Sequence, residues 1–556
     1  MALRGILCAL LVAVAAAMTA AGPAAAAQPG FVEAVGQTVS GPAAARDTHA
    51  KWVRLWLSWS SAEPARGSYV QAPFQVLRDR VAAYHAAGTK VDIVLFMTPP
   101  WARLGLTANP FTPPADPADY AAFARYAATS VPGADAWELW NEEDDNAFWE
   151  HGPQVAAYTR LLRAAYPAIK SVRPSATVVT GGMVGQDVAF LDGIYANGGR
   201  GYFDAVGVHT DFACLVDDPS AYYRDPNGWL GRYTFTGYRE LHYVMATHGD
   251  GQKPIWLTEL GWNTATSAPG SCARGRWAHM KAAGVTEAQQ ATLLTRAYQC
   301  LAADPYVQVA IWFSLQDVDD SSEDDHRLGL IRHDGSHKPA YAAFAALNNG
   351  VKAASCGGVA DHTPPRLTVG TPTDGKRYLK RLPISVSASD ATPLTHIEAL
   401  VDGVRRGLWH KSAVSQPAWW PAAGLAYGRH TITFRAMDAG RNVTSRSVTV
   451  YRVRHLAATL VTRTSLRVSR RPGGRLRVAA ALRYPAGQGQ PEGRIYVVFE
   501  RRAGSRWRAK LHRWVRAGSR AFTVKLGRGR WRVHAIFPKS APYKASHSGY
   551  RPLTVR

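Results

Sequence analysis

The chain has 556 residues, of which 47% are hydrophobic, so it is long enough for three or four domains with packed cores. Its formal net charge of +24 is spread unevenly, because residues 454–556 hold 25 Lys and Arg against two Glu. About one net positive charge is left for everything before them. A partner recognised by charge therefore concerns this last segment and not the rest of the chain.

The first 27 residues are typical of a secretory signal. Arg4 precedes an apolar run over residues 5–18, and small residues continue to Ala27. A membrane anchor would need about 20 uninterrupted apolar residues flanked by charge, which no later segment offers. We therefore expect residues 1–27 to be removed, and the mature chain to be secreted without a transmembrane segment.

Between residues 28 and 350, short apolar β-branched runs alternate with amphipathic Ala-rich stretches, the pattern of βα units around a parallel sheet. The expected strand cores are residues 31–35, 52–56, 91–96, 136–139, 177–180, 205–209, 255–259 and 309–313. The expected helices are a short one near 43–50, then 74–87, 118–128, 155–172, 189–196, 237–247, 287–303 and 338–347. Eight units of this kind predict a (β/α)₈ TIM barrel. A doubly wound open sheet is the competing layout, but no Gly-x-Gly-x-x-Gly follows the first strand.

After residue 350 the helical period disappears. Residues 351–364 are expected to be a linker, and alternating strand patterns fill the rest of the chain. Residues 365–453 contain an Asp-Ala-Gly turn between alternating strands and resemble a bacterial immunoglobulin-like domain. Residues 454–556 are expected to form a basic all-β domain, a second immunoglobulin-like sandwich. The predicted fold is thus a TIM barrel followed by two all-β sandwich domains.

Four cysteines lie beyond the signal, an even number that suits disulfides in an oxidising compartment and allows three pairings. None has the spacing of a metal ligand. Cys214 and Cys272 fall in loops expected at one end of the barrel, whereas Cys300 and Cys356 belong to its other side. We therefore predict the pairs Cys214–Cys272 and Cys300–Cys356.

Two glutamates end apolar strands of the predicted barrel. Glu142 follows strand four in the sequence Ala136-Trp-Glu-Leu-Trp-Asn-Glu142, and Glu259 ends strand seven. Because the loops at the carboxyl ends of barrel strands build the active site, both side chains are expected in one cleft. Cleavage of a glycosidic bond requires such a pair, one carboxyl group to protonate the leaving oxygen and one carboxylate to stabilise the anomeric carbon.

On these residues the sequence resembles clan A of the glycoside hydrolases, whose acid/base Glu follows an Asn after strand four and whose nucleophile ends strand seven. Residues 140–142 match the first signature and residues 257–262 the second. Residues 52–67, 97–101 and 329–341 are similar to families 5 and 39 of the clan. The resemblance covers residues 28–350. It implies a retaining β-glycoside hydrolase that acts on a poly- or oligosaccharide by double displacement, with Glu142 as acid/base and Glu259 as nucleophile.

The same resemblance implies roles for four further residues, each with a structural alternative. Arg54 would keep the nucleophile ionised, or form a structural ion pair. Asn141 would bond the sugar 2-hydroxyl, or cap a helix. His209 holds the place of the clan histidine, or is a packed core histidine. Trp312 would be the sugar platform, or part of the barrel core.

Two departures from the clan pattern support another function. Glu143 stands where proline usually follows the acid/base residue, and Asp211 stands where a tyrosine often supports the nucleophile. The alternative is a catalytically weak or idle protein on a glycosidase scaffold that binds carbohydrate or mediates adhesion at the cell surface. The two retained glutamates favour the enzyme.

Neither a cofactor nor a metal ion is expected. The acidic stretch 317–325 carries calcium-type oxygen ligands but lacks EF-hand spacing, and a solvated loop is the preferred interpretation. Loop tryptophans at 59, 101, 149, 229 and 262 could form outer sugar subsites or belong to the core.

For the basic segment 454–556 we expect an anionic cell-wall polymer or acidic polysaccharide as partner, held by charge. Nucleic acid is disfavoured because no recognition motif accompanies the charge.

Overall fold

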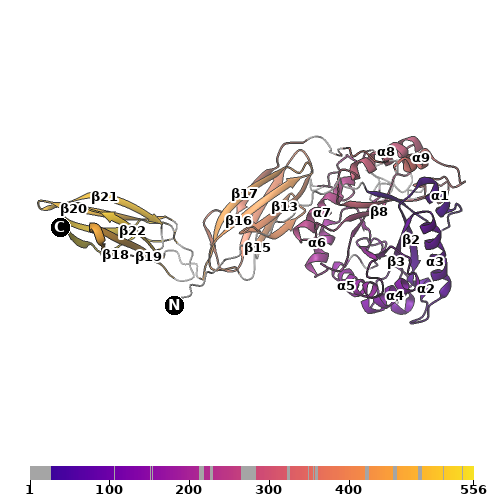
Figure 1. Ribbon diagram of the computed structural model, residues 1–556, viewed down its shortest axis with the longest axis horizontal. Coiled ribbons are helices and arrows are strands. Elements are labelled where there is room, and N and C mark those ends of the chain that lie inside the picture. The colour runs from indigo at the N-terminus through magenta and orange to yellow at the C-terminus, as the bar shows by residue number, and fades with distance from the viewer. Residues whose placement is uncertain are drawn as a thin grey trace, which may run out of the picture. The chain divides into compact units, whose positions relative to one another are not determined.

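The chain divides into two compact units: residues up to Tyr223 with Gly231–Gly358, and Arg224–Leu230 with Val359–Arg556 (Figure 1). The computed structural model describes residues 27–556 except 35, 106, 151, 153, 212–217, 226–229, 265–283, 322–325, 348–349, 355, 357–360, 420–424, 455–459, 486–490, 492, 517–518 and 541–542. The predicted signal segment, except Ala27, and the predicted pair Cys214–Cys272 lie outside these residues. In the described part of the chain, no helix combines the length and apolar character that crossing a membrane requires.

The first unit is a barrel of parallel strands, which confirms the predicted fold. Its strands are β1 (Gln28–Val32), β2 (Trp52–Ser58), β3 (Lys90–Phe96), β4 (Ala136–Leu139), β5 (Thr177–Thr180), the short β6 (Met183–Val184), β7 (Val206–Asp211), β8 (Ile255–Gly261) and β9 (Val307–Trp312). They follow the order β5-β4-β3-β2-β1-β9-β8-β7-β6. A parallel bridge from Val179 to Ala205 joins β5 to the start of β7 and closes the barrel.

Helices surround these strands, as Figure 1 shows. They are α1 (Gly41–Thr48), α2 (Trp59–Ala62), α3 (Gln71–Ala86), α4 (Pro117–Ser130), α5 (Val155–Val172), α6 (Val188–Ala196), α7 (Tyr238–Thr247), α8 (Glu287–Leu301) and α9 (Pro339–Leu347). Their starts are encoded locally: Asp116 and Asp187 cap α4 and α6, and Thr286 forms a capping box with Gln289 at α8. Cys300 of α8 forms the predicted disulfide with Cys356.

The largest displacement from the sequence prediction is in β1, which begins three residues before the expected core at 31–35. Its first residues, Gln28-Pro-Gly, are poor strand formers, so propensity argues against them. Tertiary pairing decides otherwise, because Gln28 to Phe31 pair in parallel with Val309 to Trp312 of β9.

The second unit begins with a sandwich of two sheets. One sheet consists of β10 (Arg366–Thr371), β12 (Leu382–Ser389) and β15 (Ala413–Trp419), and the other of β11 (Lys376–Tyr378), β17 (Val443–Arg452), β16 (Gly428–Asp438), β13 (Leu394–Val401) and β14 (Val404–Trp409). Burial alternates strictly along β12, so that Leu382, Ile384 and Val386 enter the core with Ile432 and Phe434 of β16.

A second sandwich follows in the same unit. Its three-stranded sheet holds β18 (Arg463–Arg471), β19 (Arg475–Arg483) and β22 (Ser519–Lys525), and its larger sheet β21 (Arg506–Arg516), β20 (Arg494–Ala503), β23 (Gly529–Phe537), β24 (Ser546–His547) and β25 (Arg551–Val555). Ile495, Val497 and Phe499 of β20 are fully buried between the sheets. Two all-β sandwiches thus follow the barrel as predicted, while the exact domain boundaries stay predictions.

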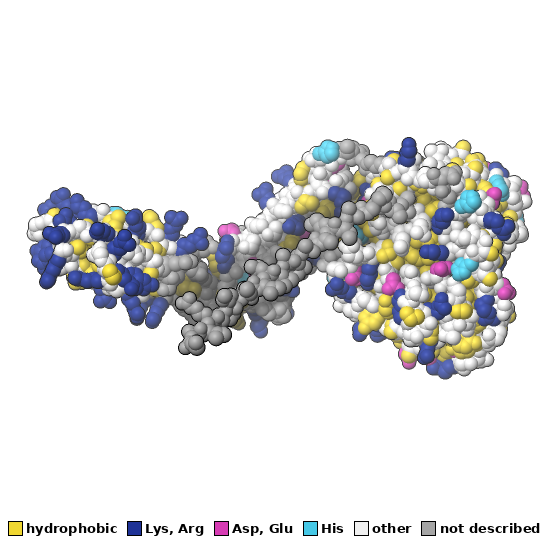
Figure 2. All heavy atoms as spheres, in the orientation of Figure 1, with side chains coloured by type: hydrophobic (Ala, Val, Ile, Leu, Met, Phe, Trp, Pro, Cys, Tyr) yellow, Lys and Arg dark blue, Asp and Glu magenta, His cyan; other side chains and the backbone are white. Residues whose placement is uncertain are grey.

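The outer face of the three-stranded sheet is lined by cations. Leu466 and Leu476 point into the core, and alternation places the exposed arginines on the opposite face. The register sets like charges directly opposite one another in the pairs Arg463 with Arg483, Arg471 with Arg475, and Arg475 with Lys525. Figure 2 shows Lys and Arg side chains covering much of this sandwich.

Candidate active site

Glu142 projects from an unusual turn at the carboxyl end of β4. Trp140 and Glu142 have φ angles of 81° and 49°, values that few non-glycine residues adopt and that cost conformational energy. The turn is fixed by the Trp140 backbone N–H, which donates to the carbonyl of Leu95 at 3.0 Å, and by its indole N–H, which donates to the carbonyl of Phe148 at 2.7 Å. These bonds hold Glu142 at the strand end, where the sequence predicted it.

Glu259 reaches the same place through an irregularity in β8. Trp256 faces the barrel interior, so simple alternation would turn Thr258 inward and Glu259 outward. The register between β7 and β8 instead slips by one residue, from Val208 opposite Leu257 to His209 opposite Glu259. Such a bulge re-aims a side chain, and here both Thr258 and Glu259 lie on the inner side.

His209 lies between the two glutamates. Its Nδ1 is 2.8 Å from Oε1 of Glu142 and 3.6 Å from Oε2 of Glu259, and its side chain is fully buried. One oxygen from each carboxylate and a histidine nitrogen all lie within 4.8 Å of one another. The structure therefore brings together the three residues that the sequence placed at the ends of three separate strands.

Arg54 connects the nucleophile candidate to a deeper carboxylate. Its Nη1 donates to Glu259 at 2.6 Å, while its Nε donates to Glu138 at 2.8 Å and its Nη2 to Asn141 at 2.8 Å. Burial opposes the charge on this guanidinium, but Glu138 and Glu259 outweigh burial and raise the pKa of Arg54 above its ordinary value. Both predicted residues, Arg54 and Asn141, are thus joined to the glutamate pair.

Glu138 and Asp92 were missed by the sequence analysis. Glu138 is fully buried and accepts hydrogen bonds from Arg54 and from the backbone N–H of Gly182 at 2.9 Å. Burial, reinforced by the charge of Glu138, raises the pKa of Asp92 well above its usual range. The available signal was a glutamate inside the apolar stretch Ala136–Leu139, two residues from the inward-facing Ala136.

Two glycines after β5 make room for this cluster. A Cβ on Gly182 would overlap the imidazole of His209 and would lie 2.7 Å from the hydroxyl oxygen of Thr258. A Cβ on Gly181 would overlap the carboxylate of Glu143. The pair Gly181-Gly182 is therefore required by close approach, a need that no local sequence pattern announces.

The loop after β4 begins with two buried carboxylates, Glu143 and Asp144. Glu143 is fully buried, and burial together with the neighbouring Asp144 raises the pKa of Glu143 well above its usual range. Burial also raises the pKa of Asp144 to about 8, although Arg232 pairs with it. Asp144 accepts the backbone N–H of Val184 at 3.0 Å. Glu143 thus occupies the proline position as a fully buried side chain. The side chain of Asp211 lies outside the described residues.

A cavity of about 560 Å³ opens above Glu142 and Glu259. Its described lining is rich in aromatic rings: Trp56, Phe96, Phe111, Phe148 and Phe313. The ring centroids of Trp56 and Phe96 are 5.1 Å apart, and those of Phe111 and Phe148 are 5.0 Å apart, so the rings form a continuous wall. Rings of this kind pack against the apolar C–H face of a sugar.

Trp312 does not contribute to that wall, which corrects the prediction of a sugar platform there. It is fully buried, packs on Trp262, and donates its indole N–H to the carbonyl of Leu328 at 2.8 Å. Val309 and Ile311 face inward, so alternation turns Trp312 outward and Phe313 to the cavity. The loop tryptophans 59, 149 and 262 are also fully buried, Trp101 is half-buried, and Trp229 lies outside the described residues.

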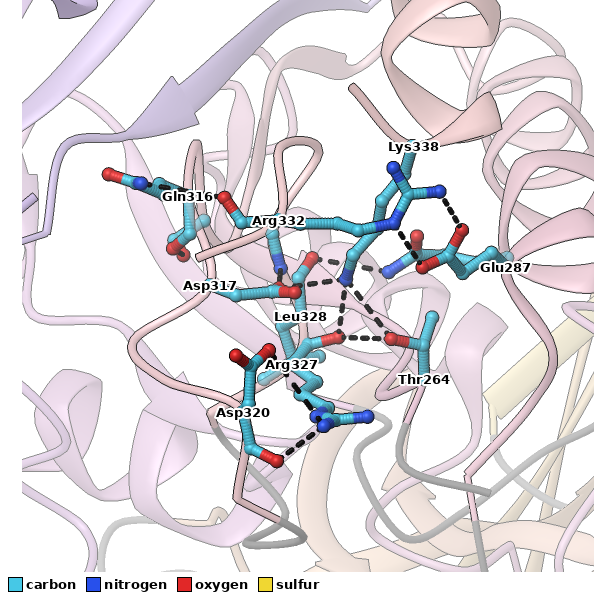
Figure 3. A network of polar contacts seen from close by, with 12 residues as sticks. Thr264, Glu287, Gln316, Asp317, Asp320, Arg327, Leu328, Arg332 and Lys338 are labelled. Atoms are coloured by element: carbon cyan, nitrogen blue, oxygen red, sulfur yellow. Dashed lines mark hydrogen bonds and ion pairs between the residues drawn. The ribbon is translucent and has the colours of Figure 1, made fainter. Parts of the chain in front are cut away.

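A buried lysine, Lys338, holds the loop after β9. Lys338 Nζ lies 2.8 Å from Asp317, 3.0 Å from the hydroxyl of Thr264 and 3.1 Å from the carbonyl of Arg327, as Figure 3 shows. Burial raises the pKa of Asp317 to about 6, against the opposing effect of Lys338. The first residue of the acidic stretch is thus an ion-pair partner. This network also fixes the cavity residue Leu328, which follows Arg327.

Among the residues that the structure describes, two groups of side chains have a spacing that a metal ion could use. One is Glu142, His209 and Glu259, but the Arg54 guanidinium already binds Glu259 and repels a cation. The other is Asp361, Asp390 and Asp438 of the first sandwich, where donors from Thr363, Thr392 and Asn442 occupy the carboxylates. Geometry therefore favours a carboxylate pair without a metal in the barrel.

No family model and no curated protein matches this chain. Solved structures with a similar fold include glycoside hydrolases. A family 39 glycoside hydrolase from Bacteroides cellulosilyticus has a TM-score of 0.47 at 20% identity, over 70% of this chain and 79% of that one. An endo-β-1,4-mannanase from Thermotoga petrophila has 0.38 at 15%, over 77% and 98%. A glucosidase from Croceicoccus marinus has 0.41 at 13%, over 89% and 93%. At this level the likeness concerns the fold, and function has to be argued from the site.

Proposed function

We propose that the barrel is a retaining β-glycoside hydrolase that acts on a poly- or oligosaccharide. The observation that carries this proposal is the pair Glu142 and Glu259, which face one aromatic-lined cavity with carboxylate oxygens within 4.8 Å. Retaining glycosidases keep their two carboxyl groups about 5–5.5 Å apart, whereas inverting ones need roughly 6.5–9.5 Å to admit a water molecule. The short spacing supports retention of configuration.

Arg54 distinguishes the two glutamates chemically. Its charge-assisted bond of 2.6 Å to Glu259 stabilises the ionised form of that carboxylate, as a nucleophile requires. Glu142 has no such bond from Arg54 and faces His209 instead. This asymmetry supports Glu259 as nucleophile and Glu142 as acid/base.

The reaction then proceeds in two displacements. The Glu259 carboxylate attacks the anomeric carbon while Glu142 gives its proton to the departing glycosidic oxygen. Water next attacks the anomeric carbon, gives a proton to Glu142, and breaks the ester bond to Glu259. Asn141, held by Arg54 and lining the cavity, is placed to bond the sugar beside the reacting carbon.

The test is chemical rescue. Glu259→Ala is expected to abolish hydrolysis of an aryl glycoside, and added azide should restore turnover as a glycosyl azide of inverted configuration, because the small anion enters the space of the lost carboxylate. Glu142→Gln should slow substrates with poor leaving groups most. Glu287→Gln, a half-exposed glutamate paired with Arg332, is the matched control and should retain the wild-type rate. Full activity of Glu259→Ala would contradict the mechanism.

Inactivity of the wild type on a panel of aryl glycosides and polysaccharides, with retained binding, would favour the alternative of an idle carbohydrate-binding scaffold. The feature that supports this alternative is Glu143, which is buried at the position where the clan usually has proline. Glycan binding and turnover are therefore to be measured on the same panel.

We also propose that the mature chain is secreted and that its last sandwich binds an anionic cell-wall polymer by charge. The signal-like start supports export. The cationic face of β18, β19 and β22 supports polymer binding, because like charges set opposite each other repel until an anion neutralises them. Cell fractionation tests export, and salt-dependent retention on isolated wall material tests the binding.

A further inference from the structure

The larger sheet of the last sandwich has an outer face unlike that of the three-stranded sheet. Trp531, Val533 and Ala535 of β23 are buried, so alternation places Arg530, Arg532 and His534 on the outer side. Tyr496 and Glu500 of β20 share this outer side by the same rule. The face therefore combines cations with an aromatic ring.

Further rings extend the aromatic character across the face. Register sets Tyr496 opposite Trp514 of β21, with ring centroids 4.3 Å apart, and Trp514 is 54% exposed. At the other edge, Tyr550 directly precedes β25 and is 53% exposed. With β20 and β23 between them, the two edges are roughly 15 Å apart at the usual strand spacing. A patch of that width suits a polymer better than a single sugar.

Arg532 is held rigidly among these rings. Its guanidinium carbon lies 4.8 Å from the ring centroid of Trp507 and 4.1 Å from that of Tyr550, and its Nε bonds Glu500 at 2.6 Å. A guanidinium that is stacked and bonded has lost much of its side-chain entropy before any ligand arrives. Its remaining N–H groups form a fork that matches a carboxylate.

We propose that this face, defined by Tyr496, Trp507, Trp514, Arg532 and Tyr550, binds an acidic polysaccharide of the uronic-acid type. Pyranose rings stack on Trp514 and Tyr550 through their C–H faces. Residues 454–556 hold 25 Lys and Arg against two Glu, a surplus of 23 positive charges that attracts the carboxylates of the polymer, and Arg532 binds these carboxylates. The choice of sugar over single-stranded nucleic acid, which also stacks on rings, rests on the proposed glycosidase function.

The three-stranded sheet offers a matched control for charge alone. The described outward positions of β18, β19 and β22 carry arginines, lysine and small residues but no aromatic ring. Removal of Trp514 and Tyr550 changes no charge, whereas removal of Arg467 and Arg477 changes charge without touching a ring. The two pairs of substitutions therefore separate stacking from attraction.

The experiment measures binding by the full chain carrying Glu259→Ala, so that no probe is hydrolysed. The probes are polygalacturonate, neutral dextran, linear polyphosphate and a thymidine oligonucleotide, in about 0.15 and 0.3 M NaCl, conditions that screen charge to different extents. Trp514→Ala with Tyr550→Ala should weaken polygalacturonate binding about tenfold and leave polyphosphate binding within about twofold. Arg467→Gln with Arg477→Gln should weaken polyphosphate at least as much as polygalacturonate.

Three results would overturn the proposal: unchanged polygalacturonate affinity in the ring variant, equal losses for polyphosphate, or an equal loss for the oligonucleotide. Thermal unfolding of each variant shows whether the sandwich still folds, and Arg532→Gln tests the carboxylate contact without removing a ring. Hydrolysis of a small aryl glycoside should be unchanged by these substitutions when Glu259 is intact. A failure of the glycosidase proposal would appear in that assay, and a failure of this one only in binding.

Discussion

The barrel and the last sandwich hold their arginines in opposite ways. Arg54 is fully buried and bonded to Glu138, Glu259 and Asn141, whereas Arg477 stands exposed on a strand beside other cations. A buried charge persists only when partners replace the water it has lost, so its surroundings are specified in detail. An exposed charge needs no partner, so it can accumulate in numbers. The candidate site of the barrel therefore depends on a few specific contacts, whereas the attraction of anions by the sandwich depends on its total charge.

The largest expected effect is the loss of Arg54. Arg54→Met leaves Glu138 and Glu259 buried without their cation, and we expect the free energy of unfolding of the barrel to fall by about 3–5 kcal/mol, together with loss of activity. Arg477→Met, the same change in the sandwich, should alter stability by less than about 0.5 kcal/mol. Urea denaturation followed by tryptophan fluorescence measures both.

The double variant Arg54→Met with Glu138→Leu sharpens the result. This variant also removes Glu138, one of the two buried carboxylates that Arg54→Met leaves without a cation. It should therefore be more stable than Arg54→Met alone, although still inactive. If Arg54→Met and Arg477→Met lowered the free energy of unfolding equally, burial would not explain the difference between the arginines of the barrel and those of the sandwich.

A smaller effect is expected from a substitution at Gly182, where the added side chain changes packing and not charge. Gly182→Ala forces a Cβ against His209 and Thr258, and a shift of His209 would misplace Glu142 and Glu259. We expect kcat/KM on an aryl glycoside to fall about a hundredfold, because a displacement near 1 Å has that consequence in an active site. Gly527→Ala in the sandwich, where a Cβ would meet nothing within 4 Å, should leave activity unchanged. Wild-type activity of Gly182→Ala would show that the cluster adapts.

Most of the barrel could be predicted because each strand carries its own apolar signal and its own end. Glu142 and Glu259 were found as glutamates at strand ends, and Arg54 and His209 through the resemblance to the clan; the fold then brought the four residues together. The prediction of a sugar platform at Trp312 was wrong for a physical reason: neighbouring residues of β9 point to opposite faces of the strand. Because Val309 faces the barrel interior, every second residue after it also faces inward, and Phe313 therefore lines the cavity in place of Trp312.

Glu138, Asp92 and Gly182 could not have been found by the same reasoning. A carboxylate in the middle of an apolar strand contradicts the pattern that defines the strand, and its partner Arg54 lies 84 residues away. Gly182 is required because His209 of β7 and Thr258 of β8 pack against it. Such residues are defined by tertiary contacts between distant segments, which a single sequence does not display.

Asp250 of the barrel is intermediate between the buried Arg54 and the exposed arginines of the sandwich. Its carboxylate accepts a hydrogen bond from Arg200 at 3.2 Å and pairs with Lys253 at 2.9 Å. Burial alone would raise the pKa of Asp250, but these bonds outweigh it and hold the pKa below the ordinary value. Because the folded pKa is lowered, the stabilisation is present above the unfolded pKa of about 3.9 and is lost as pH falls through the folded value. Asp250→Asn should thus cost about 0.5–1 kcal/mol at pH 7, and this cost should shrink as pH falls through the folded pKa. A pH-independent cost would indicate a packing effect.

The smallest effect is expected where the charges are most numerous. Arg463→Gln with Arg475→Gln removes members of the cross-strand pairs with Arg483, Arg471 and Lys525, so it relieves repulsion without breaking any described ion pair. We expect the sandwich to be unchanged or more stable, by at most about 0.5 kcal/mol in low salt. The gain should vanish at about 1 M salt, where the Debye length is about 3 Å and neighbouring arginines no longer interact. Thermal unfolding at both salt concentrations measures this. A loss of stability would mean that these arginines make contacts of their own, and the contrast with Arg54 would then be one of degree rather than of kind.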